Sequence, residues 1–126
     1  MRFLSEEHLV AVTEALAEDE AVVAGAAGVN LGLNYVISNA PEGDFTYHIA
    51  VRDGAASMGR GEVDNPDANL QSSYDTAAKI SRGDTTSQMA VMTGKIKVRG
   101  SVGTIMKHTK LLGMIEAHAN GFVLEY

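Results

Sequence analysis

"MAVMTGKIKVRGSVGTIMKHTKLL", residues 89–112, changes its hydrophobic period halfway along and so predicts a strand followed by a helix. Apolar and cationic side chains alternate in its middle, with Ile96 and Val98 on the apolar side, as in a strand with one face in water. Ser101 then precedes apolar residues at helical spacing, and serine is a favoured N-cap. We therefore expect a half-buried strand that ends in a capped helix.

The cations of this stretch are unusual because the whole chain carries a net charge of −6. Three of them, Lys95, Lys97 and Arg99, form the outward set of the predicted strand, so we interpret them as a solvated sheet face. Lys107 and Lys110 fall on the predicted helix, where they can reach a ligand head group or a membrane surface.

Upstream of this stretch, the chain alternates with the period of a β-strand. "VNLGLNYVIS" (residues 29–38) and "FTYHIAVRD" (residues 45–53) predict two antiparallel strands with one apolar face. Their opposite face is predicted to carry Asn34, His48 and Arg52 into solvent. The Asp-Gly pair at positions 53–54 predicts a tight hairpin into a weaker, glycine-containing strand, and "ANLQSSY" predicts a fourth strand.

Helices are predicted before and after these four strands. "SEEHLVAVTEALAED" (residues 5–19) has a serine N-cap, two glutamates in its first turn and apolar residues at helical spacing. "DTAAKISRG" and "DTTSQMAVMTG" predict two short helices, each of which begins near an Asp or Thr and stops at a glycine. The chain of 126 residues is predicted to form one domain, residues 1–126.

Composition excludes several kinds of function. The chain has no cysteine, so disulfides, thiolate metal sites and cysteine nucleophiles are absent. No run approaches 18 apolar residues, and the first residues turn acidic too soon for a signal peptide, so we expect a cytoplasmic protein. Residues 1–67 carry 12 acidic and 3 basic side chains, a balance that argues against a nucleic-acid partner.

No catalytic, metal or cofactor site is predicted. The four histidines match no metal-ligand spacing, and "RGSVG" has Arg99 where a nucleophile elbow needs glycine. Ser101 is therefore interpreted as a helix cap. Neither the dinucleotide-binding nor the P-loop glycine pattern is present, so a dedicated nucleotide site is not expected.

Methionine is concentrated near the end of the chain. Four of the six methionines lie in or beside the last predicted helices: Met89, Met92, Met106 and Met114. Such side chains fill cores, and they also adapt to irregular ligands. The pattern by itself fits core packing and ligand contact alike.

Several motifs in order resemble the sterol carrier protein-2 family of sterol-transfer domains. They are "FTYHIAVRDG", then "ANLQSSYDTAAKISRGD", and most specifically "MTGKIKVRGSVGTIMK". The resemblance covers roughly residues 20–117, and the chain looks like a small single-domain bacterial-type member. Ser101 replaces an acidic or amide residue common in the family, and His108 and Thr109 make the last helix more polar than usual.

The resemblance implies an α/β fold of the α+β type with two layers. These are a five-stranded, mainly antiparallel sheet and helices that cover one of its faces, with an apolar tunnel between them. Matched to this sequence, the helical side of the tunnel is lined by Met89, Met92, Ile105, Met106 and Met114. Its floor on the sheet is formed by Tyr35, Tyr47 and Ile49.

The function implied by the resemblance is non-catalytic binding and transfer of fatty acyl chains, sterols or similar lipids. No cofactor is implied, and transient membrane contact through Lys107 and Lys110 is compatible with it. Two other classes stay open on the sequence. One is a small isomerase or cyclase for an apolar substrate, with Asp53, Tyr47 or His108 as its acid–base groups. The other is a module whose groove receives a partner helix.

Overall fold

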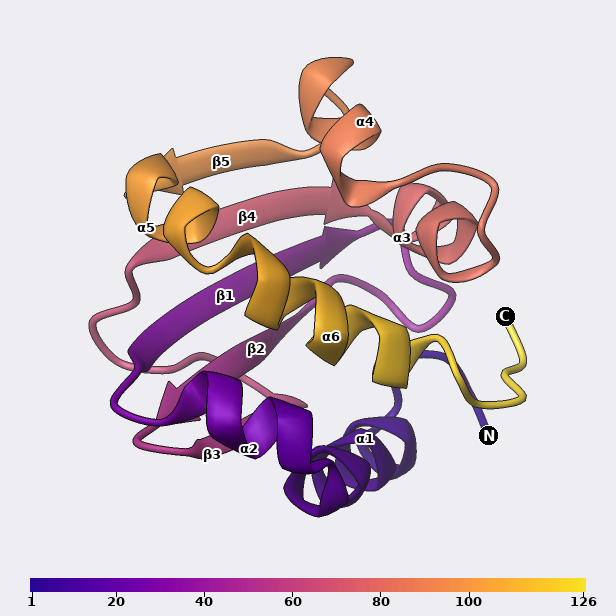
Figure 1. The fold of residues 1–126 in the computed structure, drawn as a ribbon. Helices are drawn as coiled ribbons and strands as arrows, with labels where there is room; N and C mark the ends of the chain where they lie inside the picture. The colour runs from indigo at the N-terminus through magenta and orange to yellow at the C-terminus, as the bar shows by residue number, and fades with distance from the viewer.

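The computed structural model describes all residues, 1–126, and has two layers (Figure 1). One layer is a five-stranded sheet in the order β3-β2-β1-β4-β5. Neighbouring strands are antiparallel except β1 and β4, which run parallel. The strands are β1 (Asn30–Ser38), β2 (Phe45–Arg52), β3 (Ala55–Arg60), β4 (Ala68–Ser73) and β5 (Lys97–Gly100).

The other layer consists of helices that lie on one face of the sheet (Figure 1). The helices are α1 (Glu6–Glu18), α2 (Glu20–Ala26), α3 (Tyr74–Ser81), α4 (Ser87–Met92), α5 (Val102–Lys107) and α6 (Thr109–Ala119). The two-layer α/β fold with a mainly antiparallel five-stranded sheet is therefore confirmed. No helix has the length and hydrophobicity needed to cross a bilayer.

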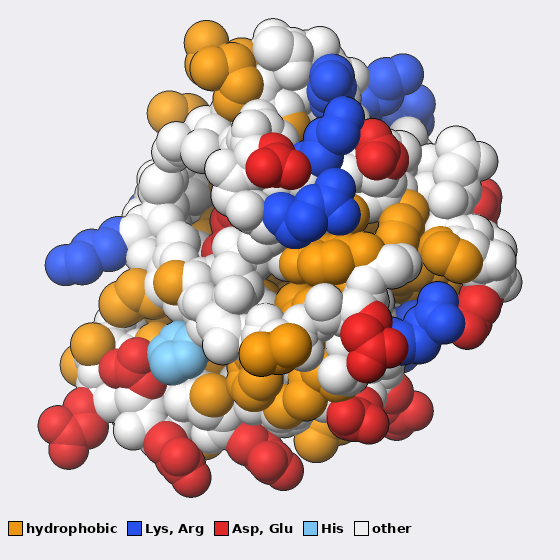
Figure 2. Space-filling view, turned by 90° about the vertical axis from the view of Figure 1, so that its right-hand side faces the viewer, with side chains coloured by type: hydrophobic (Ala, Val, Ile, Leu, Met, Phe, Trp, Pro, Cys, Tyr) orange, Lys and Arg blue, Asp and Glu red, His pale blue; other side chains and the backbone are white.

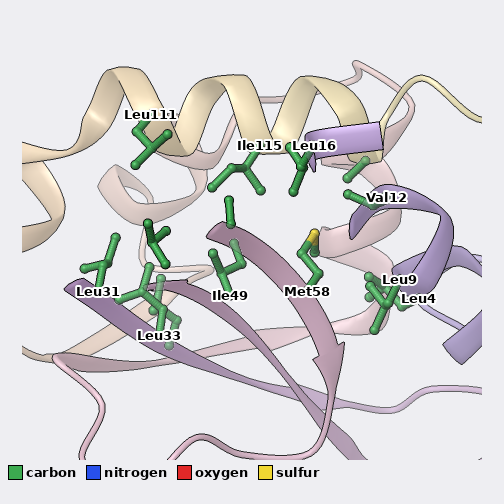
Figure 3. Packing of buried hydrophobic residues seen from close by; sticks show 14 of the residues in the cluster. Leu4, Leu9, Val12, Leu16, Leu31, Leu33, Ile49, Met58, Leu111 and Ile115 are labelled. Atoms are coloured by element: carbon green, nitrogen blue, oxygen red, sulfur yellow. The ribbon is translucent and has the colours of Figure 1, made fainter. Parts of the chain in front are cut away.

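The core lies between the helices and the sheet, and it contains 22 buried hydrophobic residues in one cluster. Leu111 and Ile115 on α6 point toward Leu31, Leu33 and Ile49 on the sheet (Figure 3). Strand alternation produces this face, because every second side chain of β1 and β2 points to the helices. Removing such a side chain from water contributes about 1.5–3 kcal/mol, so burial along α1 and α6 fixes both helices to the sheet.

Charge is unevenly distributed around these two layers. Figure 2 looks at the side of the molecule on which α3 and both chain ends lie. Acidic side chains crowd its lower edge, at the height of α1, whereas most Lys and Arg side chains lie in the upper half. The acidic first half and the basic later stretch of the sequence are thus also separated in space.

Backbone geometry explains the type of residue found at two places in the chain. Asp53 and Gly54 both have positive φ, at 43° and 92°, as a two-residue hairpin of the favoured twist requires. Gly100 has a φ of 118°, and a Cβ there would lie 2.6 Å from the Asp67 carbonyl oxygen. The close approach of β5 to the start of β4 therefore requires glycine at position 100.

The expectation that Asn34 faces solvent is wrong, since only 2% of its surface is exposed. Strands β3 and β4 are consecutive in the chain but are separated in the sheet by β2 and β1. Residues 61–67 must therefore cross the face that carries no helices. Val63 in this segment donates its N–H to the Asn34 Oδ1 atom at 2.8 Å, and its carbonyl accepts from Nδ2 at 3.2 Å.

The final helix is also divided, where the sequence predicted a single one. Helix α5 ends at Lys107, His108 serves as its C-cap, and α6 begins at Thr109. Ser101 caps α5 as predicted, because its hydroxyl accepts from the Thr104 N–H at 3.2 Å. The short helix α3 begins slightly earlier than expected, with Ser73 as its N-cap.

Candidate functional site

The floor of the candidate site is a pair of stacked tyrosines. Tyr35 on β1 and Tyr47 on β2 are register partners, and their rings lie parallel with centroids 4.8 Å apart. Both residues are half-buried and pack against the core. Ile49, two residues along β2, is buried on the same face. The three floor residues predicted from the sequence are thus neighbours on the helix-covered side of the sheet.

A half-buried carboxylate lies in the helical layer, close enough to Tyr35 and Tyr47 to contribute to the raised pKa of both. Glu116 on α6 is half-buried and lies one turn beyond Leu112, which packs against the core. Ser87, the first residue of α4, donates its hydroxyl to the two Glu116 oxygens at 3.1 Å each. This hydrogen bond joins α4 to α6 above the sheet. Glu116 was not predicted from the sequence, although an acidic residue between the buried positions Ile115 and Ala119 marks it.

Burial controls the protonation of these groups. Burial raises the pKa of Glu116, and the hydrogen bond from Ser87 opposes this in part. Burial also raises the pKa of Tyr35, with a further contribution from the Glu116 carboxylate. The pKa of Tyr47 is raised by burial, then by Tyr35 and Glu116. Both phenols therefore stay neutral at physiological pH.

The predicted lining residues of the helical layer are more exposed than the floor. Ile105 and Met114 are half-buried and contact the core, whereas Met89, Met92 and Met106 expose 51, 81 and 70% of their surface. Helix α5 buries none of its residues, and Ala90 is the only buried residue of α4. The α4–α5 end of the helical layer is thus apolar and only loosely packed on the sheet.

Two surface hollows are present away from the tyrosine pair. One, of about 210 Å³, lies near the N-terminus beside Arg2, Glu42, Asp44 and Arg60. The other, of about 220 Å³, is lined by Asp19, Met114, Ala117 and His118. Met114 thus faces a hollow on the α1–α2 side of α6. Tyr35, Tyr47 and Glu116 line neither hollow.

The acid–base candidates named from the sequence do not form a common site. Asp53 lies in the hairpin turn between β2 and β3, where it accepts from the Gly28 N–H at 3.1 Å. His108 occupies the break between α5 and α6, and Tyr47 lies on the sheet. No hydrogen bond connects any two of these three side chains.

The sequence matches a family model described as the SCP-2 sterol transfer family over residues 12–113. The chain belongs to this family. The resemblance stated from the motifs of residues 92–107 is thereby confirmed. A search of curated proteins found no match to the sequence.

Solved structures share the same fold at low sequence identity. A conserved hypothetical protein of Thermus thermophilus, described as a candidate sterol carrier protein, has a TM-score of 0.79 at 16% identity, covering 99% of this chain and 92% of that one. The apo form of sterol carrier protein 2 from Yarrowia lipolytica has a TM-score of 0.66 at 21% identity, covering 95 and 94%. A palmitated sterol carrier protein 2-like protein from Aedes aegypti has a TM-score of 0.62 at 18% identity, covering 98 and 100%.

Proposed function

We propose that this SCP-2 family protein is a non-catalytic, cytoplasmic carrier of fatty acyl chains, sterols or similar lipids, and that residues 1–126 act as one lipid-binding domain. The family match supports lipid binding and transfer. The observation that supports the location is the loosely packed, methionine-rich α4–α5 end beside the half-buried tyrosine floor. The Aedes aegypti relative, which carries palmitate, supports an acyl chain as one ligand.

In this proposal, the ligand enters between α4, α5 and α6 and the sheet. Tyr35, Tyr47 and Ile49 form the floor, and Ile105 and Met114 flank the core. The exposed side chains at the mouth are those of Met89, Met92 and Met106. Unbranched thioether side chains adapt to ligands of different shape, as a carrier with several ligands requires.

The energetics agree with a carrier. Burial of a chain of about 16 carbons contributes roughly 12 kcal/mol, at about 0.8 kcal/mol per methylene. Ordering and translational terms oppose binding by several kcal/mol, so micromolar or somewhat tighter affinity remains. A transfer protein needs such an intermediate affinity because the ligand must also leave.

The test is a titration of delipidated protein with a fluorescent fatty acid and with a fluorescent sterol. We expect saturable binding of at least one of them in the micromolar range. Absence of saturable binding of both below about 100 μM, which corresponds to about 5.5 kcal/mol, contradicts the proposal.

We also propose that Lys107 and Lys110 contact anionic membranes during transfer. Both side chains are exposed; Lys107 shares α5 with the exposed Met106 and Val102, and Lys110 lies in the first turn of α6. Cationic side chains next to an apolar edge suit the headgroup region of a bilayer. No nucleic-acid partner is proposed, since the net charge of −6 opposes one.

A further inference from the structure

Half of the six methionines of this protein are exposed at its surface. Met89, Met92 and Met106, called the exposed methionines below, expose 51, 81 and 70% of their surface, whereas Met58 exposes 7%. Methionine is ordinarily among the most buried residue types, so exposure on this scale is an informative observation. The sequence contains neither cysteine nor tryptophan. The side chains that are most open to oxidation at the surface are therefore these three thioethers.

The exposed methionines lie on two short helices that bury little. Met89 and Met92 are three residues apart on α4 and so share one side of that helix, and Met106 lies on α5, which buries none of its residues. Threonine side chains hold the backbone at two of them. The Thr93 hydroxyl donates to the Met89 carbonyl at 2.9 Å, and the Thr109 hydroxyl donates to the Met106 carbonyl at 2.8 Å. The backbone is thus fixed while the thioethers reach solvent, so a change at sulfur does not require either helix to open.

A thioether in these surroundings is open to one well-defined reaction. When hydrogen peroxide meets the sulfur, an S–O bond forms and the O–O bond breaks. The sulfur is oxidised by two electrons, and the remaining oxygen of the peroxide leaves as water. The product, methionine sulfoxide, is polar, and dedicated reductases reverse the reaction with two electrons from a pair of thiols, again releasing water. Because the oxidant must reach the sulfur, exposure decides which methionines react.

We propose that Met89, Met92 and Met106 are reversible oxidation sites, at which a peroxide lowers the affinity of this protein for lipid. The proposal rests on the lipid carrier function, in which these side chains form the mouth of the site. Each sulfoxide places a polar oxygen where the reduced side chain offers an apolar and adaptable surface. Met58 stays outside the reaction, because the folded protein gives a peroxide little access to its sulfur.

The first experiment maps the reaction along the chain. Folded, delipidated protein is treated with hydrogen peroxide, and sulfoxide formation at each methionine is followed by peptide mass spectrometry. We expect the exposed methionines to react at least about tenfold faster than Met58, and the rates to converge when the same treatment is carried out in urea. Equal rates at Met58 and at the exposed methionines in the folded protein contradict the assignment.

The second experiment measures the consequence for lipid binding. Untreated, oxidised and re-reduced samples are titrated with the fluorescent fatty acid and the fluorescent sterol. We expect oxidation to weaken binding at least about fivefold. Treatment with a methionine sulfoxide reductase and dithiothreitol should restore the affinity. Thermal melts of the three samples should agree, because the oxidised side chains are exposed in the folded protein.

Two variants separate the exposed methionines from Met58. One combines Met89→Leu, Met92→Leu and Met106→Leu. Leucine has no sulfur, so the affinity of this triple variant after peroxide treatment should equal its own affinity before treatment. The control is Met58→Leu, a swap of similar volume that keeps the exposed methionines and should lose affinity on oxidation as the wild type does.

The outcomes distinguish the oxidation proposal from the carrier function. If peroxide leaves the lipid affinity of the wild type unchanged, or if the triple variant loses as much affinity as the wild type, the oxidation proposal is wrong and the carrier function stands. If the untreated protein binds neither fluorescent ligand, the carrier function fails, and the oxidation proposal fails with it.

Discussion

His8 is the polar residue most deeply enclosed in this protein, and its replacement by leucine tests how the helical layer is fixed. The ring has no exposed surface. Its Nδ1 atom accepts the Leu4 N–H at 3.0 Å, so the proton lies on Nε2, which donates to the Ala119 carbonyl at 2.9 Å. One neutral side chain thereby joins the N-terminal segment to the last residue of α6.

His8→Leu keeps an apolar side chain of similar size but leaves both backbone groups without a partner. Each buried, unpaired backbone group costs about 1–3 kcal/mol, so the two together cost about 2–6 kcal/mol. The greater apolar burial of leucine offsets about 1 kcal/mol of this cost. We expect the free energy of unfolding to fall by about 1–5 kcal/mol at pH 7.5.

The pH dependence provides a second, independent readout. Burial lowers the pKa of His8, so below about 6.5 the unfolded chain takes up a proton at this position before the folded protein does. The wild type therefore loses stability through His8 as the pH falls below that value, by at most about 1.4 kcal/mol per pH unit. In His8→Leu, this contribution to the pH dependence of the free energy of unfolding should be absent.

Urea denaturation followed by circular dichroism between pH 5 and pH 8 measures both quantities. The control is His48→Gln, because His48 is half-exposed and makes a single hydrogen bond, to the Gly61 carbonyl at 3.1 Å. We expect this control to cost under about 1 kcal/mol. If His8→Leu is as stable as the wild type at pH 7.5, or keeps the full slope below pH 6.5, the structural role assigned to His8 is refuted.

Three further predictions concern the candidate site. Because burial raises the pKa of Glu116, the folded protein keeps a proton there that the unfolded chain loses, and its stability falls as the pH rises from about 4.5 through the raised value. Glu116→Gln should flatten that fall in the same denaturation series. An unchanged slope would argue against the raised pKa of Glu116. Met106→Glu should leave the melting temperature nearly unchanged, because the side chain is 70% exposed, but should weaken lipid binding about tenfold, or ~1.4 kcal/mol. If the variant binds lipid as tightly as the wild type, Met106 does not line the mouth of the proposed site. Replacing Lys107 and Lys110 by glutamate should slow lipid transfer to anionic vesicles but not to neutral ones, and an equal effect on both kinds of vesicle would contradict the membrane contact.

The layers of the fold could be predicted from residues 29–53 because alternation decides which side chains face the helices. Leu31, Leu33 and Val51 are fully buried on the predicted side. The environment of Asn34 could not be predicted in this way. It depends on the strand order, since only a crossing from β3 to β4 brings Val63 over that position.

The candidate site was predictable in part. Alternation predicted the face of the sheet on which Tyr35 and Tyr47 lie, whereas their pairing across β1 and β2 became visible only with the strand register. The division of the last helix was not visible, since the apolar spacing continues across His108 without a glycine or proline. Glu116 was missed because a charged side chain at the edge of an apolar helix face usually points to solvent, and only its contact with Ser87 on another helix shows otherwise.

The uneven packing of the helical layer bears on how this protein can diversify over evolutionary time. Stability is concentrated in α1, the C-terminal part of α6 and the strands beneath them, where the largest fully buried side chains lie. Surface substitutions away from such features usually change stability by less than about 0.5 kcal/mol. The α4–α5 end can therefore accept many mutations without unfolding the protein. With the lipid site at that end, as we propose, ligand preference can drift there while selection preserves the remainder, so a lineage can acquire a new ligand through viable single-residue steps.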